Sequence, residues 1–322
     1  MAKWENNIAT ITIPTPFPVG DVNSFLIKGD ALTLIDAGPK TAEAEQALNE
    51  ALRELHLDKR DIDQIIITHH HPDHVGGVDF FSSELPLIGH EENNRWLNMT
   101  NEVLNAYNQF YYQLGQDMGL PEQYSEVIDI REDVSIKFIC NRSALTDTLG
   151  EGDDIPGLHG WKVFETPGHA QSHIILFRES DGLVIGGDLL LQHVSPNPII
   201  EPPMTPFGDR AKSQLLLNES LLKLSELPIS FVYAGHGERI DEPKELIQRR
   251  LASQHGRAMR VRSMLEEKPS TVFEICKKLF PKVYKKQLGL TLSETMAQID
   301  YLLNIDAIVG EKREYGIVYD VK

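Results

Sequence analysis

Alternating and helical runs of apolar residues divide the first 240 positions of the chain. Residues 8–13 alternate with a period of two, and residues 23–36 predict a strand, a turn at Gly29-Asp30 and a second strand. Residues 41–57 carry apolar side chains at helical spacing behind Thr41, which suits a helix N-cap. Further strands are predicted at 65–68, 85–88, 162–166, 173–177, 183–185 and 229–234, and helices at 91–118 and 209–226. Strands in both halves of the chain, each interleaved with helices, indicate two sheets packed between helical layers.

The tail of the chain, residues 241–322, follows a different pattern. Helices are predicted at 245–265, at 272–280 with Ser270 or Thr271 as N-cap, and at 292–304. A β-hairpin is predicted from Ile308-Val309 and 317–319, with a turn at 310–316. The order helix, helix, helix, hairpin is the outline of a winged helix. We therefore expect a large domain at 1–240 and a small winged-helix-like domain at 241–322.

Charge supports that boundary. The 322 residues carry a net charge of −17, but residues 1–238 hold 15 Lys and Arg against 36 Asp and Glu, whereas residues 239–322 hold 16 against 12. No apolar stretch approaches the roughly 18 residues of a membrane helix, and the polar N-terminus lacks the apolar core of a signal peptide. Cys140 and Cys276 are the only cysteines, which argues against a disulfide framework or a thiolate zinc site. We expect a cytoplasmic protein without a membrane partner.

A dense group of metal-binding side chains follows the apolar run at 65–67. The segment His69-His70-His71-Pro72-Asp73-His74 holds four imidazoles and a carboxylate, and Gly76-Gly77 follows it. Imidazole suits Zn, Fe, Mn, Co or Ni, and a carboxylate serves a hard or borderline cation. A surface histidine cluster is the plain alternative. A buried strand that runs into a ligand loop is, however, typical of a built metal site.

Three later positions repeat the arrangement of apolar strand, glycine and metal-competent side chain. They are His169 after Pro167-Gly168, Asp188 after Gly186-Gly187, and His236 after Gly235. Each alone is more simply explained as a structural residue at a strand end. The recurrence of one pattern at four strand ends favours a shared metal centre.

These residues resemble the metallo-β-lactamase superfamily, whose pattern is H-x-H-x-D-H followed along the chain by a His, an Asp and a His. The resemblance spans about residues 8–238. It implies an α/β fold, a four-layer αββα sandwich with the metal site at one edge between the sheets. The tail is similar to that of a β-lactamase-like branch with C-terminal winged helices, and the family also holds thioesterases of the glyoxalase II kind.

The resemblance also implies roles for single residues. His69, His71 and His169 would bind a first metal ion, Asp73, His74 and His236 would bind a second, and Asp188 would bridge both. His70 and Pro72 fall at variable positions and receive no ligand role. Asp36, in Leu34-Ile35-Asp36-Ala37-Gly38, matches a strand-end Asp that supports the ligand loop from behind. An ordinary turn residue is the alternative for Asp36.

Differences between this sequence and several branches of the family argue against membership of those branches. The β-lactam-hydrolysing members with a cysteine ligand would need Cys where Gly187-Asp188 stands. The tail is too short for the flavodoxin-like domain of a diiron flavoprotein, and the chain is too short for the inserted clamp of large RNA-processing members.

Two segments bear on the substrate. Residues 92–128 are rich in aromatic and soft apolar groups, which predicts a helical cap over the site, with ordinary helix core as the alternative. A lysine cluster precedes the helix at 292–304 (Lys277, Lys278, Lys282, Lys285 and Lys286). That helix has Glu294 and Asp300 but no Lys or Arg, which argues against a major-groove reader. We interpret the lysines as a solvated face, and expect the tail to shape the active-site entrance or a homodimer contact.

The resemblance thus implies a dinuclear metal-dependent hydrolase, with two divalent ions, of which Zn is favoured over Fe or Mn. A metal-bridging hydroxide would attack a thioester, ester or lactone carbonyl, and Asp73 would orient that nucleophile and shuttle its proton. The alternative is a single-strand RNA endonuclease or phosphodiesterase with the same metal site, and a metal-sensing winged-helix regulator is a third reading. We expect a small-molecule substrate, with RNA as the less favoured partner.

Overall fold

The computed structural model describes residues 2–124, 137–205 and 208–322, and it contains two large β-sheets. In these residues the first sheet has seven strands in chain order, antiparallel from β1 to β4 and parallel from β4 to β7. Its strands are β1 (Trp4–Glu5), β2 (Ile8–Ile13), β3 (Val22–Lys28), β4 (Leu32–Ile35), β5 (Gln64–Ile66), β6 (Leu87–Gly89) and β7 (Asp147–Thr148).

The second sheet has the order β12-β11-β10-β9-β8 in the described part of the chain. Its strands are β8 (Asp154–Ile155), β9 (Leu158–Glu165), β10 (Ile174–Arg178), β11 (Leu183–Ile185) and β12 (Phe231–Tyr233). The pair β11 and β12 is parallel, and the other neighbours are antiparallel. Parallel neighbours matter for the site, because the carboxyl ends of such strands meet at one edge of a sheet.

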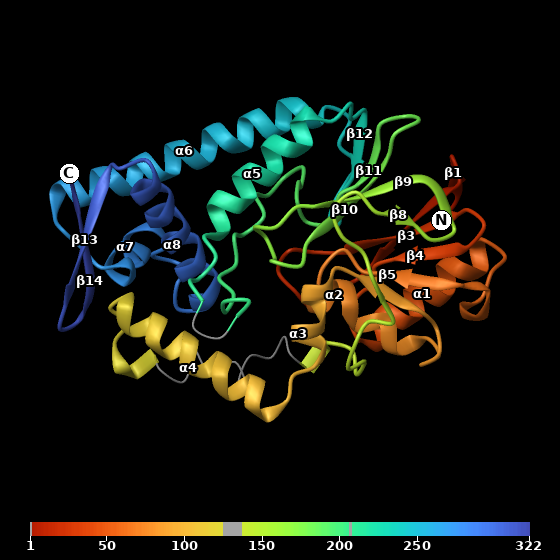
Figure 1. Cartoon of the computed structure of the whole chain (residues 1–322), viewed down its shortest axis with the longest axis horizontal. Coiled ribbons are helices and arrows are strands. Elements are labelled where there is room, and N and C mark those ends of the chain that lie inside the picture. Colours follow the sequence, from red (N-terminus) through yellow and green to blue (C-terminus); the bar gives the residue numbers. More distant parts are fainter. Residues whose placement is uncertain (1, 125–136, 206–207) are drawn as a thin grey trace.

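Helices cover the outer faces of both sheets, as Figure 1 shows. The helices of the body are α1 (Ala42–Glu54), α2 (Pro72–Val75), α3 (Asn94–Leu97), α4 (Asn101–Asp117) and α5 (Ser213–Glu226), and single 3-10 turns lie at Lys59–Asp61, Gly76–Phe80 and Glu91–Asn93. Thr41 caps α1 by accepting a hydrogen bond from the amide of Ala44 at 3.1 Å, as its sequence predicts.

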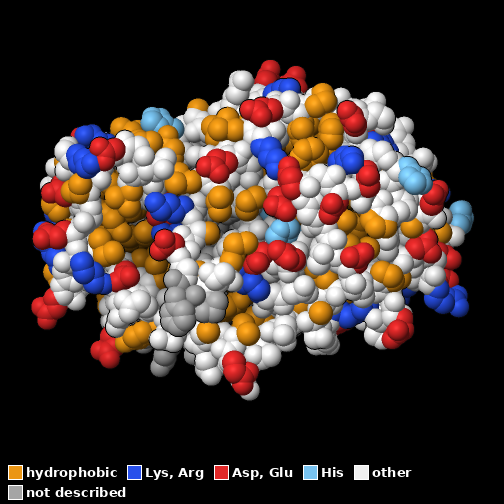
Figure 2. Space-filling view, viewed as in Figure 1, with side chains coloured by type: hydrophobic (Ala, Val, Ile, Leu, Met, Phe, Trp, Pro, Cys, Tyr) orange, Lys and Arg blue, Asp and Glu red, His pale blue; other side chains and the backbone are white. Residues whose placement is uncertain are grey.

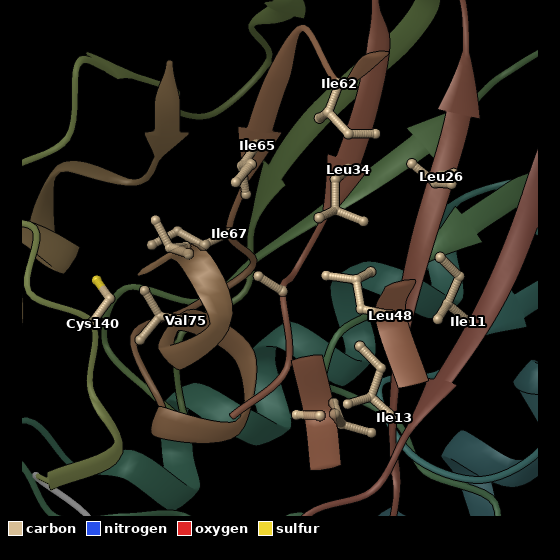
Figure 3. Close-up of a cluster of buried hydrophobic side chains, with 14 of the residues drawn as sticks. Ile11, Ile13, Leu26, Leu34, Leu48, Ile62, Ile65, Ile67, Val75 and Cys140 are labelled. Atoms are coloured by element: carbon tan, nitrogen blue, oxygen red, sulfur yellow. The ribbon is translucent and has the colours of Figure 1, made fainter. Parts of the chain in front are cut away.

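Buried side chains divide into the layers of an αββα sandwich. Along β3 to β5 they alternate between the two faces of the first sheet, so that Leu26, Leu34 and Ile65 pack under α1 while Phe25 and Ile66 face the second sheet. Figure 3 shows the layer between the first sheet and α1. A third cluster lies between the outer face of the second sheet and α5. Both sheets are therefore buried on both faces, which explains their nearly continuous apolar strands. The predicted four-layer fold is confirmed.

The predicted cap segment contains α3 and α4, and its residues 125–128 lie outside the described part of the chain. Trp96 and Tyr107 pack against each other with ring centroids 5.2 Å apart. Phe110 and Leu114 instead pack against the apolar cluster of the tail. Helix α4 therefore spans from the body to the tail along one side of the molecule (Figure 1).

The tail has the predicted order of elements. Its helices and strands are α6 (Pro243–Glu267), α7 (Val272–Leu279), α8 (Leu288–Asn304), β13 (Ile308–Arg313) and β14 (Gly316–Val321). Thr271 caps α7, and its side chain and that of Glu274 form a reciprocal capping box. The hairpin differs from the prediction, because its strands pair up to Arg313 and Gly316. The predicted turn at 310–316 therefore shrinks to Glu314 and Tyr315.

Helix α8 is almost wholly buried against α5, α6 and α7. Polar side chains share this burial, with Glu294 accepting a hydrogen bond from Gln298 at 3.0 Å and Asp300 pairing with Arg210. A recognition helix must expose its side chains to reach bases in a groove. The burial of α8 therefore agrees with the absence of Lys and Arg from it.

Hydrogen bonds also join α8 to the body. Arg210 donates to both carboxylate oxygens of Asp300 at 2.8 Å, and the side chain of Asn197 donates to the carbonyl of Leu290 at 3.1 Å. The amide of Ile200 donates to the hydroxyl of Ser293 at 3.3 Å. Helix α6 belongs to both parts, since Leu246 packs with the body and Val261 with the tail.

Surface chemistry is mixed on the face drawn in Figure 2, where hydrophobic side chains gather over the tail and Lys and Arg lie among Asp and Glu elsewhere. In the described residues no helix has both the length and the apolar character needed to cross a membrane.

We predict that Arg210→Met weakens the joint between body and tail. The side chain of Asp300 is only 3% exposed, so loss of its partner leaves a buried unpaired carboxylate. The free energy of unfolding, measured with urea, should fall by about 3–5 kcal/mol. Arg249→Met, at an exposed position of α6, is the control and should change it by less than about 0.5 kcal/mol. Equal effects of the two substitutions would contradict this account.

Candidate metal centre

The candidate site lies where strands of both sheets end. The segment after β5 carries His69 and His71, and Pro72 then opens α2, whose first turn holds Asp73 and His74. Proline suits that first helical position because its missing N–H would have no partner there. From the second sheet, the turn after β9 supplies His169, β11 leads to Asp188, and β12 leads to His236.

The structure brings together all seven side chains that the sequence singles out as ligands. Their nitrogen and oxygen atoms form overlapping groups, each with its atoms within 4.8 Å of one another: His69, His71 and His169; His69, His74 and Asp188; Asp73, His74 and His236. Asp188 lies in the middle, with its carboxylate oxygens 3.5 Å from Nε2 of His74, His169 and His236.

Three imidazoles have their outward nitrogen fixed by an acceptor. Nδ1 of His169 donates to the carbonyl of Asn197 at 2.9 Å, and Nδ1 of His236 donates to the carbonyl of Asp21 at 2.8 Å. Nδ1 of His74 lies 2.7 Å from a carboxylate oxygen of Asp36. A carbonyl only accepts, so Nδ1 holds the proton and Nε2 is the nitrogen that points into the cluster.

Several inward atoms are buried and have no hydrogen-bond partner in the described residues. They are Nε2 of His69, His74 and His236 and Oδ1 of Asp188. A buried polar atom without a partner costs about 1–3 kcal/mol, and a charged one costs more. Bound divalent cations would satisfy all four atoms, because neutral imidazole and carboxylate are their usual ligands. The donor set therefore fits a metal centre.

Asp36 lies directly behind the ligand loop, with a left-handed backbone (φ 56°) and only 1% exposure. It accepts hydrogen bonds from the amide and the hydroxyl of Thr68, both at 2.8 Å, in addition to its contact with His74. This carboxylate therefore fixes both the start of the loop and the orientation of one imidazole. Such carboxylate–histidine contacts are typical of the shell behind metal ligands.

His173 is a functional residue that the sequence analysis missed. Its Nε2 accepts a hydrogen bond from the amide of Asp188 at 3.0 Å, and its Nδ1 contacts the hydroxyl of Thr166 at 2.8 Å. Burial, and then the charge of His169, lower the pKa of His173 to about 3, so it is neutral. It holds the backbone of Asp188 in place. The sequence gives only a weak signal for this role, namely a second histidine four residues after His169.

Charges in the cluster are uneven. Burial, followed by neighbouring imidazoles, holds the pKa of His69 and of His71 well below the usual value. Burial also opposes charge on His74 and His236, but Asp188 outweighs it, and the pKa of His236 rises to about 10. Burial alone would raise the pKa of Asp188, whereas His236 and His74 lower it well below the usual value. The negative charge of Asp188 therefore favours the protonated, positively charged forms of His74 and His236.

Two glycines are required by close packing around Asp188. A Cβ on Gly187 (φ 46°) would lie 2.7 Å from Nε2 of His173, and one on Gly235 would lie 2.3 Å from Oδ1 of Asp188. The glycines that the sequence places beside Asp188 and His236 thus have a steric reason.

His70 lies beside the ligand His71, with ring centroids 4.8 Å apart, but it belongs to none of the three groups that contain the seven side chains. Its ring is stacked on Trp96 with centroids 4.4 Å apart, and its Nδ1 lies 2.9 Å from the hydroxyl of Ser172. Its Nε2 is 3.9 Å from Glu201, whose pKa burial raises to about 7. The cap segment therefore reaches the ligand loop through Trp96.

Comparisons with known proteins agree with this geometry. The chain matches the model of the metallo-beta-lactamase superfamily over residues 17–236. It is 45% identical to a probable metallo-hydrolase of Bacillus subtilis, YqjP, over 94% of both chains. It is 24% identical to a beta-lactamase-like protein 2 homolog of Caenorhabditis elegans, over 79% of this chain and 68% of the relative.

Solved structures extend the likeness to the tail. A metallo-beta-lactamase family protein from Thermus thermophilus is 26% identical and superposes with a TM-score of 0.82 over 99% of both chains. A beta-lactamase domain protein from Burkholderia ambifaria, at 22% identity, shares the fold with a TM-score of 0.77 over 99% of this chain and 94% of its own. The chain belongs to the metallo-beta-lactamase superfamily and is a metallo-hydrolase, with a His and Asp cluster suited to divalent metal.

Proposed function

We propose that the chain binds two divalent metal ions and hydrolyses a thioester, ester or lactone. His69, His71 and His169 would hold the first ion, Asp73, His74 and His236 the second, and Asp188 would contact both. The observation that carries this proposal is the set of buried, unpartnered nitrogen and oxygen atoms that converge on Asp188. Zinc is the favoured metal, since five imidazoles and two carboxylates suit it, and Fe or Mn are the alternatives.

Bound there, the ions would polarise a substrate carbonyl and lower the pKa of a water molecule toward about 7. The chain supplies the orientation. Asp73 lies at the edge of the cluster, with a carboxylate oxygen 3.4 Å from Nε2 of His236. We assign it the task of orienting the attacking water and accepting its proton. Asp36, His173 and the carbonyls of Asn197 and Asp21 hold the ligands still during this step.

An acyl substrate is supported by the surroundings of the site. The aromatic side chains of Trp96 and Tyr107 come from the cap segment, and Trp96 stacks on the ligand loop at His70. The net charge of −17 would repel a polyanion at long range. We therefore propose a small-molecule substrate. Since the sequence has only two cysteines, which suits a reducing compartment, we also propose a cytoplasmic location.

A second candidate function is cleavage of single-stranded RNA at the same metal site. The observation that favours it is the lysine cluster at the end of α7 and in the turn that follows, whose members are all exposed (Lys277, Lys278, Lys282, Lys285 and Lys286). These lysines could contact phosphates without any base readout by the buried α8.

Hydrolysis assays at increasing salt should separate the two functions. A panel of thioesters, lactones, phosphodiesters and short RNAs would be tested with the metal-loaded protein. We expect turnover of an acyl substrate that is nearly indifferent to salt, because no polyanion is bound, whereas RNA cleavage would weaken steeply. Asp188→Ala should abolish turnover, and Asp154→Ala, at an exposed position of the same sheet, should not. Salt-sensitive cleavage of RNA alone would contradict the acyl proposal.

We predict that Gly235→Ala disables the centre without unfolding the protein. The new Cβ would lie 2.3 Å from Oδ1 of Asp188 and 2.9 Å from the carbonyl oxygen of Gly187, so the carboxylate and the turn before it must shift. Metal analysis should find fewer than two ions per chain, and hydrolysis should fall at least about 100-fold, as expected for a misplaced central ligand. Gly256→Ala in α6, where a Cβ would meet nothing within 4 Å, should keep full metal content. Two tightly bound ions in Gly235→Ala would contradict the central place of Asp188.

We predict that metal uptake releases protons. His74 and His236 have raised pKa values and therefore hold protons at neutral pH in the metal-free protein. Binding must displace these protons, so metal uptake at pH 7.5 should release protons to the solution. Because protons compete with the ions below the raised pKa values, metal affinity should fall as the pH is lowered from about 8 to about 6. An indicator-dye titration measures both, and metal binding without proton release would overturn this assignment of charge.

A further inference from the structure

The outward nitrogen of one ligand histidine has no partner in the described residues. Thr68, Asp36, Asn197 and Asp21 provide oxygens next to the Nδ1 atoms of His69, His74, His169 and His236, in that order. His71 is turned the other way, because its Nδ1 lies 2.9 Å from Nε2 of His169 and faces the cluster. Its Nε2 is therefore the nitrogen that points out of the centre.

A buried carboxylate lies next to His71. Glu201 is 2% exposed, and one of its oxygens lies within 4.8 Å of a ring nitrogen of His71. Its Oε1 accepts a hydrogen bond from the amide of Gln171 at 3.0 Å, whereas its Oε2 is buried without a partner. A carboxylate in this state requires a donor, since desolvation of an unpaired oxygen is costly.

His70 does not provide that donor. Its Nε2 lies 3.9 Å from Oε1 of Glu201, beyond hydrogen-bond distance. Its ring is fixed by the stack on Trp96 and by the contact of Nδ1 with Ser172. Trp96 also interacts with Glu201, yet Oε2 keeps no hydrogen-bond partner in the described residues. His71 lies too far from Glu201 for a direct hydrogen bond, and it is the ligand histidine that can reach this carboxylate through one water molecule.

We infer that Glu201 is a positioning residue that holds the Nε2 proton of His71 through one bridging water molecule, and so aims Nδ1 at the metal ion shared with His69 and His169. This inference rests on the proposed metal centre. Metal-binding histidines regularly donate their second ring N–H to a carboxylate, which fixes the tautomer and makes the ligand more basic. A single water molecule spans such a gap at little cost.

Contacts from three parts of the molecule hold Glu201 in place. The carbonyl of the next residue, Pro202, accepts from Arg95 of the cap at 2.9 Å and from Gln171 of the ligand turn at 3.1 Å. On the other side, the carbonyl of Ile200 accepts from Tyr111 of α4, and its amide donates to Ser293 of α8. The cap and the tail therefore both act on the metal centre through the position of Glu201.

The test compares Glu201→Gln with the wild type after loading with zinc. A competing chelator should remove one of the two ions about 10–100-fold more readily from the variant, while the affinity for the other stays unchanged. Long-range proton–nitrogen NMR of the wild type should show His71 bound through Nδ1 and protonated at Nε2, and the Nε2 proton should shift or exchange faster in Glu201→Gln. Glu294→Gln, which alters a buried carboxyl of the tail, should match the wild type in both readouts.

Two results would overturn the inference about Glu201. The first is a variant that binds both ions with wild-type affinity and keeps an unchanged Nε2 proton on His71. The second is a third zinc ion in the wild type that Glu201→Gln loses, because Glu201 would then be a ligand. If Glu201→Gln does not fold, Glu201→Asp keeps the carboxylate and should give an intermediate loss of affinity, and the wild-type NMR result still decides. Absence of bound metal from the wild type would instead refute the proposed function.

Discussion

The burial of Asp188 among imidazoles is the constraint on which the site depends. Its carboxylate faces three Nε2 atoms at 3.5 Å, too far for good hydrogen bonds and close enough for a shared cation. A charged group in this position is tolerated only with compensating charge. The surrounding chain accordingly holds Asp188 in one position. Its amide donates a hydrogen bond to the ring of His173, and neighbouring glycines leave no room for larger side chains.

The direction of neighbouring strands in the two sheets brings these groups together. β4 and β5 are parallel in one sheet, and β11 and β12 are parallel in the other, so four strand ends meet at one edge of the sandwich. Ligands on strand ends are more rigid than ligands on long loops, which suits a site that needs tight geometry. The segment that holds Asn197 and Glu201 is the exception. It has no regular structure of its own, and it takes its shape from the cap, the ligand turn and the tail.

The difference between ligands at strand ends and supporting groups in an irregular segment explains what could be predicted from the sequence. The layers and the helices of the tail follow from periodicity, and the residues that meet at Asp188 follow from a repeated pattern of strand, glycine and ligand. The groups that hold the ligands in place were harder to predict from the sequence. The carbonyls of Asn197 and Asp21 carry no side-chain signal, because any residue could supply them. His173 appears in the sequence as an ordinary strand residue. Glu201 stands beside two prolines in an aperiodic stretch, so nothing local predicts its burial.

The central claim is that the seven side chains around Asp188 hold two metal ions. Anomalous X-ray diffraction from crystals of the zinc-loaded protein, measured on both sides of the zinc absorption edge, tests it most directly. The account predicts two anomalous peaks about 3.5–4 Å apart. One should lie among His69, His71 and His169, the other among Asp73, His74 and His236, with Asp188 reaching both. A single peak, or peaks away from Asp188, would contradict it.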